Sequence, residues 1–224
     1  MKVSTINTIE ISSLCDNACR YCPCKDQGKY RPVGLMEFDT FKKAVNWALR
    51  FARQGTQREL NLFGVGEPTL HPQLVDMVAY ARDHLPFAPL HLNTNGNQMT
   101  EALARRLKDA GVNKIDITGH NHFSTARTIK ICKSVGIQFS VSYDFALHPN
   151  NWAGQVDWFE PDYDLGPCPW IERGQVMVMS DGRVTTCCID AFGRNVFATI
   201  DDDLPSYEVK PSDLCKKCHH SIPS

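Results

Sequence analysis

Ten cysteines are the residues of this 224-residue chain best able to do chemistry, and nine of them stand in groups. The groups lie early, late and at the end of the chain: Cys15, Cys19, Cys22 and Cys24; Cys168, Cys187 and Cys188; Cys215 and Cys218. In a reducing compartment, grouped cysteines bind metals or react more often than they form disulfides. The start of the chain has no apolar core typical of a signal peptide, so we expect a cytoplasmic protein with metal or iron–sulfur sites.

The early group has the spacing of an iron–sulfur loop. Cys15, Cys19 and Cys22 follow an apolar run at 8–12, and a loop this short can place three thiolates around one face of a [4Fe–4S] cluster. Such a cluster takes four cysteines when the protein supplies every ligand. Three cysteines would leave one iron open, and an open position is where a metal site does chemistry. The alternative is a zinc site with Cys24 as fourth ligand, because short cysteine spacings also indicate zinc.

The later cysteines could form a second site. Four of them are the candidate ligands: Cys168, Cys187, Cys215 and Cys218. Zinc and a [4Fe–4S] cluster both accept four thiolates, so ligand count does not separate them. Cys188 stands beside Cys187 and leaves the choice of ligand open. If the metal is zinc, His219 and His220 are further candidate ligands.

Strand and helix patterns alternate through the first two thirds of the chain. We expect strands at 8–12, 59–63, 89–92, 112–118 and 137–143. Helical spacing of apolar residues predicts helices at 39–54, from 72, at 100–110 and at 125–135, with Asp39 as N-cap of the first. Short connections between alternating strands and helices predict parallel strands joined by right-handed crossovers.

These units are too few for a closed eight-stranded barrel. We therefore expect an α/β fold, a partial (β/α)5-6 TIM-like barrel over 1–147. An irregular stretch then leads to strands at 175–179 and 183–186, joined by an Asp-Gly turn, and 148–224 should form a small C-terminal extension. Parallel sheets bind ligands at the carboxyl ends of their strands, and the cysteine loop and several polar segments follow such ends.

The segment after the second strand reads Gly64-Val65-Gly66-Glu67-Pro68. Together with Cys-x3-Cys-x2-Cys just past the first strand, it resembles the signature of the radical S-adenosylmethionine (SAM) superfamily, with Val65 replacing one small residue. The resemblance implies that the amino and carboxylate groups of SAM chelate the open iron. One electron then cleaves SAM to methionine and a 5′-deoxyadenosyl radical, which abstracts a hydrogen atom from the substrate.

The same resemblance implies roles for residues at the strand ends. Tyr21 would lie near the adenine, the segment at 64–68 would bind the SAM amino group, and Thr118 would contact the ribose. The candidate cofactor-binding residues are Tyr21, Gly64, Gly66, Glu67, Pro68, Asn95 and Thr118.

The later cysteines resemble the twitch extension of the SPASM/twitch radical SAM group, which carries one auxiliary [4Fe–4S] cluster. This implies two clusters and a dehydrogenase: the radical takes hydrogen from a carbinol carbon, a base takes the hydroxyl proton, and the auxiliary cluster takes the remaining electron. The candidate bases are His120, His122, Tyr143, Asp144 and Arg173.

Other reactions fit the same residues. An epimerase or isomerase would need a thiol to return hydrogen, and Cys188 is the first candidate, ahead of Cys24 and Cys132. Peptide modification is another alternative, and a non-enzymatic zinc scaffold is the last.

The expected partners are a small or carrier-attached substrate and a flavodoxin- or ferredoxin-like electron donor of low potential. A net charge of −1 gives no sign of a nucleic-acid surface, and no apolar run has the length of a membrane span.

Overall fold

The computed structural model of the chain describes residues 1–143, 151–157, 166–218 and 220. Its strands are β1 (Thr5–Ile9), β2 (Leu60–Leu62), β3 (Leu90–Thr94), β4 (Lys114–Thr118), β5 (Gln138–Ser142), β6 (Gln175–Val178), β7 (Arg183–Thr185) and β8 (Val196–Thr199). Its α-helices are α1 (Phe38–Arg53), α2 (Leu74–His84), α3 (Glu101–Asp109), α4 (His122–Val135) and α6 (Pro169–Glu172).

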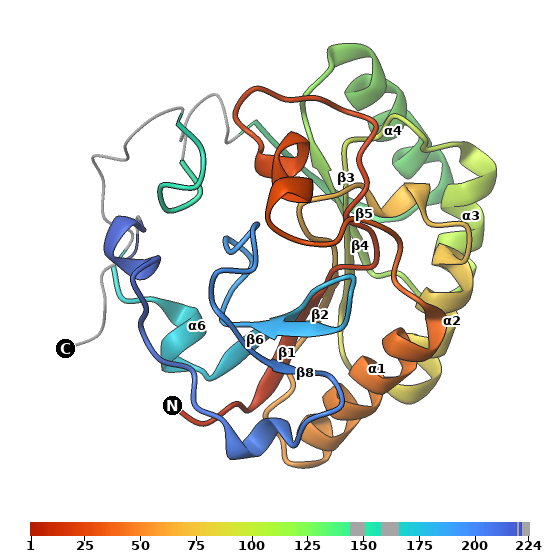
Figure 1. Cartoon of the computed structure of the whole chain (residues 1–224). Coiled ribbons are helices and arrows are strands. Elements are labelled where there is room, and N and C mark those ends of the chain that lie inside the picture. Colours follow the sequence, from red (N-terminus) through yellow and green to blue (C-terminus); the bar gives the residue numbers. More distant parts are fainter. Residues whose placement is uncertain (144–150, 158–165, 219, 221–224) are drawn as a thin grey trace.

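All the strands form one eight-stranded sheet in the order β5-β4-β3-β2-β1-β6-β7-β8. The strands from β5 to β6 are parallel, whereas β7 and β8 continue antiparallel. Helices α1 to α4 are arranged along one side of the sheet, and the C-terminal segments lie on the other side (Figure 1). This is the expected α/β fold with a partial TIM-like barrel.

The middle of the sheet is buried because both of its faces are covered. Every residue of β1 and β2 is buried, as expected for parallel strands with chain packed on both faces. Helix α1 turns Phe41, Val45 and Phe51 into the same core. None of the helices in the described part of the chain is long and apolar enough to span a membrane.

The predicted elements are found, with shifted ends. The first strand begins at Thr5, because β1 follows the register of β6 from Thr5↔Gln175 onward. The N-cap position of α1 is Glu37 rather than the predicted Asp39, whose carboxylate pairs with Lys42 at 2.9 Å. Neither β8 nor α6 was expected, since each has only 4 residues, too few to show a periodic pattern.

The sheet runs across the expected boundary between 147 and 148. Because β6 pairs with β1, it is the sixth parallel strand and also the first strand of the antiparallel hairpin. The extension is therefore joined to the strand that leads into the cysteine loop.

Candidate functional site

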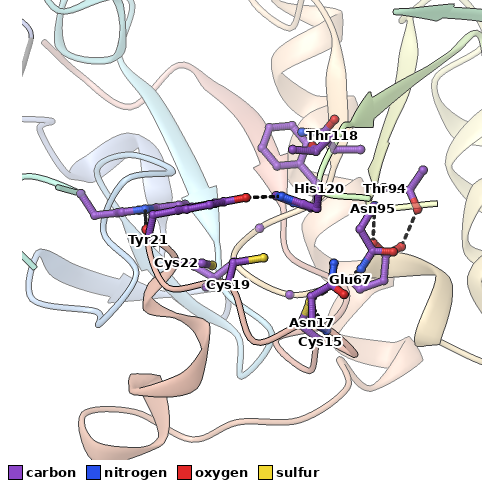
Figure 2. A pocket seen from close by; sticks show the side chains of 16 residues that line it. Cys15, Asn17, Cys19, Tyr21, Cys22, Glu67, Thr94, Asn95, Thr118 and His120 are labelled. Atoms are coloured by element: carbon purple, nitrogen blue, oxygen red, sulfur yellow. Dashed lines mark hydrogen bonds between the residues drawn. The ribbon is translucent and has the colours of Figure 1, made fainter. Parts of the chain in front are cut away.

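A cavity of about 200 Å³ lies at the carboxyl ends of the parallel strands. Its lining comes from the last residues of β3 and β4 and from the segments that follow β1 to β4 (Figure 2). Trp152 completes the lining. The segment after β1 supplies Cys15, Cys19 and Cys22, whose thiols share this cavity. The structure therefore gathers the strand-end residues as the alternating sequence pattern predicts.

The cysteine loop turns tightly, so its three thiols lie on neighbouring turns of the loop. The backbone N–H of Cys22 donates to the carbonyl of Cys19 at 3.1 Å, and that of Asn17 donates to Cys15 Sγ at 3.4 Å. A hydrogen bond from Cys24 lowers the pKa of Cys15 to about 7, whereas burial raises the pKa of Cys22 to about 12.

The donor set at this cavity fits an iron–sulfur cluster. The cysteine loop offers three sulfur donors there, and soft thiolate ligands select zinc or Fe–S clusters. Cys24 is not among the residues that line the cavity, although its thiol hydrogen-bonds that of Cys15 and its sulfur accepts from Gln27 Nε2 at 3.2 Å. A [4Fe–4S] cluster held by these three thiols would have one iron open to an external ligand.

The glycines after β2 permit a close approach between two loops. A side chain at Gly66 would meet the carbonyl oxygens of Ser12 and Leu14, the latter at 2.6 Å. The backbone N–H of Glu67 donates to that same Leu14 carbonyl at 2.7 Å. The motif therefore packs against the cysteine loop as well as lining the cavity, a role that its sequence alone did not indicate.

Glu67 is 2% exposed, and its carboxylate joins the ends of β2 and β3. It accepts from Thr94 Oγ1 at 2.8 Å, from the backbone N–H of Asn95 at 2.7 Å, and from Thr69. Figure 2 shows the first two of these bonds. Burial raises the pKa of Glu67, although the hydrogen bonds from Asn95 and Thr69 oppose the shift. Pro68 is buried at the start of the short helix Pro68–Leu70, behind the cavity wall.

Asn95 connects the end of β3 to the cysteine loop. Its side-chain amide donates to Asp16 Oδ1 at 2.7 Å and lies 3.8 Å from Cys15 Sγ. Asn95 and Thr118, the last residue of β4, both line the cavity. Asn95 therefore stands beside the Cys15 thiol, and Thr118 contributes another part of the same lining.

Tyr21 and His120 form the opposite wall. Tyr21 Oη and His120 Nδ1 are 2.5 Å apart, and their rings are stacked with centroids 5.8 Å apart (Figure 2). Burial lowers the pKa of His120, so the imidazole is neutral near pH 7. Trp152 Nε1 donates to the carbonyl of Tyr21 at 3.0 Å. Sequence reasoning missed Trp152, although a tryptophan within a polar connecting segment was a usable signal.

The other candidate bases do not join this wall. His122 is the first residue of α4, which Asn121 caps by accepting from the backbone N–H of Phe123 at 2.8 Å. Tyr143 is 44% exposed and lies against Gly119. Arg173 is exposed just before the amino end of β6, at the opposite end of the sheet. Asp144 lies outside the described residues.

A second, smaller cavity gathers the later cysteines. Its lining includes Cys168, Cys187, Cys215, Cys218 and His220. The four predicted ligands come together although they are spread over three separate stretches of the chain. His219 lies outside the described residues.

Cys188 belongs to the neighbourhood of this second cavity. Burial, and then the nearby Cys218 and Cys168, raise the pKa of Cys188 to about 12. Among the described residues that line the first cavity, Cys188 does not occur. Its predicted role as a hydrogen donor to a substrate there gains no geometric support.

Comparison with curated proteins finds relatives that match about half of this chain. Among curated proteins, a tungsten-containing aldehyde ferredoxin oxidoreductase cofactor-modifying protein of Pyrococcus furiosus is 32% identical over 107 residues, 48% of this chain and 28% of the relative. The S-adenosyl-L-methionine-dependent 2-deoxy-scyllo-inosamine dehydrogenase of Niallia circulans is 27% identical over 121 residues, 53% of this chain and 46% of the relative. The chain thus matches less than half the length of each.

Solved structures show the same fold. The structure of BtrN in complex with AdoMet and 2-DOIA matches with a TM-score of 0.75 and 21% identity, over 92% of this chain and 81% of that one. That of anSMEcpe with AdoMet and a peptide matches with a TM-score of 0.62 and 15% identity, over 90% and 79%. The sequence model of the Radical SAM superfamily matches residues 9–133, more than half of the chain. The chain therefore belongs to the radical SAM superfamily.

Proposed function

We propose that this radical SAM protein is a dehydrogenase. Its substrate would be a small ring compound that carries amino groups or several hydroxyl groups, and the enzyme would oxidise one carbinol carbon of that ring. The observation that carries the proposal is the presence of two cysteine-lined cavities, one lined by three thiols and one by four. The inosamine dehydrogenase is among the relatives by sequence, which supports the substrate class.

In the first cavity, Cys15, Cys19 and Cys22 would hold a [4Fe–4S] cluster, with SAM beside it against the segments at 64–67 and 93–95. Together, when bound, they supply a 5′-deoxyadenosyl radical. Tyr21 and Thr118 lie on the wall where the nucleoside would rest. Glu67 already accepts several hydrogen bonds, so we expect it to shape this wall through Thr94 and Asn95.

In the second cavity, Cys168, Cys187, Cys215 and Cys218 would hold an auxiliary [4Fe–4S] cluster. Oxidising an alcohol to a carbonyl removes one hydrogen atom, one proton and one electron from the substrate. The second site gives that electron an acceptor within the chain. A reduced flavodoxin- or ferredoxin-like protein would supply the electron that starts each cycle.

His120 is the base that the geometry favours. Because burial lowers its pKa, the imidazole is neutral near pH 7 and able to accept a proton. In the tautomer whose Nδ1 donates to Tyr21 Oη, the lone pair is on Nε2. Of the candidate bases, His120 alone is among the described residues that line the first cavity.

A redox-neutral epimerase or isomerase is less well supported. Such an enzyme needs a thiol near the substrate to return a hydrogen atom. Among the described residues, the cysteines that line the first cavity are the three proposed cluster ligands. A hydrogen-donating thiol would therefore have to come from elsewhere.

Metal content and product analysis test the proposal. Anaerobically reconstituted protein should contain about eight irons per chain, with matching sulfide and no zinc. About four irons and one zinc would leave the radical SAM site in place and remove the internal electron acceptor. With a 2-deoxy-scyllo-inosamine-type alcohol, the product should be a ketone formed in equal amount to 5′-deoxyadenosine. An epimerised alcohol would contradict the dehydrogenase.

A further inference from the structure

A buried ion pair lies directly behind the wall of the first cavity. Glu10 follows β1, and Arg31 follows the cysteine loop. Arg31 Nη1 and Nη2 donate to the two carboxylate oxygens of Glu10 at 2.6 and 2.8 Å. Both side chains are 0% exposed. In the described part of the chain, both charges are therefore shielded from water.

The carboxylate of Glu10 also holds two loops that come from distant parts of the sequence. The backbone N–H of Val65 donates to Oε1 at 3.0 Å, and that of Ser180 donates to Oε2 at 3.1 Å. Val65 lies in the SAM-motif segment, and Ser180 lies in the turn between β6 and β7. Gly64 has no room for a side chain because Glu10 fills the space beside its Cα.

The guanidinium of Arg31 continues the network into the cysteine loop. Nη2 donates to Gln27 Oε1 at 2.6 Å, and the Gln27 amide donates to the carbonyl of Ser13. Ser13 Oγ in turn accepts from Ser180 Oγ at 3.0 Å. The segments that carry the cysteines, the Gly64–Pro68 motif and the β6–β7 turn are thereby tied to one another through a single charged pair.

Stability alone does not explain such a pair. Apolar residues of similar volume often fill a buried site at least as stably as an ion pair does. Arg31 Nε also has no acceptor among the described residues, which adds a cost. A bidentate pair instead adds geometric specificity, because each carboxylate oxygen and each N–H fixes the position of one particular loop.

We propose that Glu10 and Arg31 are positioning residues for SAM binding, which hold the cysteine loop, the Gly64–Pro68 motif and the β6–β7 turn at fixed distances. The inference uses the proposed function only in taking SAM as the ligand, and it is independent of the reaction that follows. Loss of either charge lets the loops move apart, although each cysteine remains present.

The test compares Glu10→Gln and Arg31→Lys with Arg82→Lys. Arg82 is a suitable control because its guanidinium also binds several groups, the carbonyls of Leu85, Pro86, Ala88 and Gly111 and the side chain of Asn113, but at the amino ends of β3 and β4. The affinity for SAM is measured by equilibrium dialysis on reconstituted protein and expressed per loaded cluster, alongside the melting temperature.

For Glu10→Gln and Arg31→Lys we expect at least a tenfold weaker affinity for SAM. Arg82→Lys should lower the melting temperature while its SAM affinity stays within twofold of the wild type. If all three variants lose stability but keep wild-type SAM affinity, the pair has only a structural role and the proposal is overturned. Failure of the wild type to bind SAM would instead contradict the proposed function.

Hydrogen–deuterium exchange on the cluster-free protein gives a second measurement. Gln27→Ala removes one link and leaves the charged pair intact, so it is the variant to use if the pair variants do not fold. In Glu10→Gln and Arg31→Lys we expect faster exchange in residues 12–22, 64–67 and 180–182 together. In Gln27→Ala, where Glu10 still accepts from Val65 and Ser180, we expect faster exchange in residues 12–22 alone, and in Arg82→Lys in none of the three segments. Faster exchange confined to the immediate neighbours of the substituted residue would overturn the proposal.

Discussion

The two cysteine-lined cavities are built in different ways. The first is surrounded by polar strand ends, held by hydrogen bonds through Glu67 and Asn95. The second has apolar walls that include Ile171, Ile189 and Leu214. Polar groups at fixed positions recognise an exchangeable ligand, whereas an apolar shell keeps water from a metal site and tunes its potential. Under the proposed function, this difference suits the first cavity to an exchangeable ligand and the second to a buried cluster that accepts an electron.

The largest effect should come from removing a ligand at the first cavity. Cys19→Ala should abolish 5′-deoxyadenosine formation and lower the iron content from about eight to about four per chain. The measurements are chromatography of the nucleoside and iron analysis. Cys132→Ala is the matched control, because Cys132 is buried in α4 away from both cavities and should retain full iron. Cleavage of SAM by Cys19→Ala would show that the cluster is elsewhere.

Removing a ligand at the second cavity should separate the two functions. Cys215→Ala should also lose about four irons, yet it should still bind SAM and form some 5′-deoxyadenosine. Formation of the oxidised product should stop, because the substrate radical has no internal electron acceptor. Equal loss of both products would mean that the second site supports the structure of the first.

The pH profile tests the base. Since burial lowers the pKa of His120, kcat/KM should fall on the acid side only below the ordinary histidine range near pH 6.5. In His120→Gln this fall of kcat/KM at acid pH, the acid limb of the profile, should disappear. The value of kcat should drop about 100-fold or more, the usual contribution of a general base. An acid limb unchanged in His120→Gln would assign it to another group. His122→Gln is the neighbouring control and should behave like the wild type.

The smallest effect should come from the aromatic edge of the first cavity. Trp152→Phe keeps a ring but removes the hydrogen bond to the carbonyl of Tyr21. One such bond contributes about 1 kcal/mol, so we expect SAM affinity to weaken by about fivefold. The measurement is the same equilibrium dialysis, with unchanged iron content. A loss of iron would instead make Trp152 part of the support for the cysteine loop.

The sequence predicts which residues come together better than it predicts the contacts that each of them makes. Alternating strands and helices place Cys15, Glu67, Asn95 and Thr118 at one edge of a parallel sheet, and the structure confirms that edge. Thr100 also caps α3, accepting from the backbone N–H of Leu103 at 3.1 Å, where the predicted helix begins. Periodicity and capping are local signals, so they can be recognised without knowledge of the fold.

The contacts that were missed depend on pairings between distant residues. Glu10 and Arg31 each look like ordinary charged residues in the sequence, and only the fold brings them together and buries both. His122 was a candidate base because it stands after a strand, but Asn121 starts a helix there and accounts for its position. The register of a strand, the partner of a side chain and its burial are properties of the assembled sheet.

The parallel pairing of β1 with β6 also has a consequence for how the protein is made. β1 is synthesised first, yet its partner on one side appears only after α1 to α4 and the strands up to β5 have left the ribosome. Until then one edge of β1 has unpaired backbone groups that another chain could pair with. Such long-range parallel contacts fold slowly, so this edge is the part of the sheet that stays open to wrong pairing for longest.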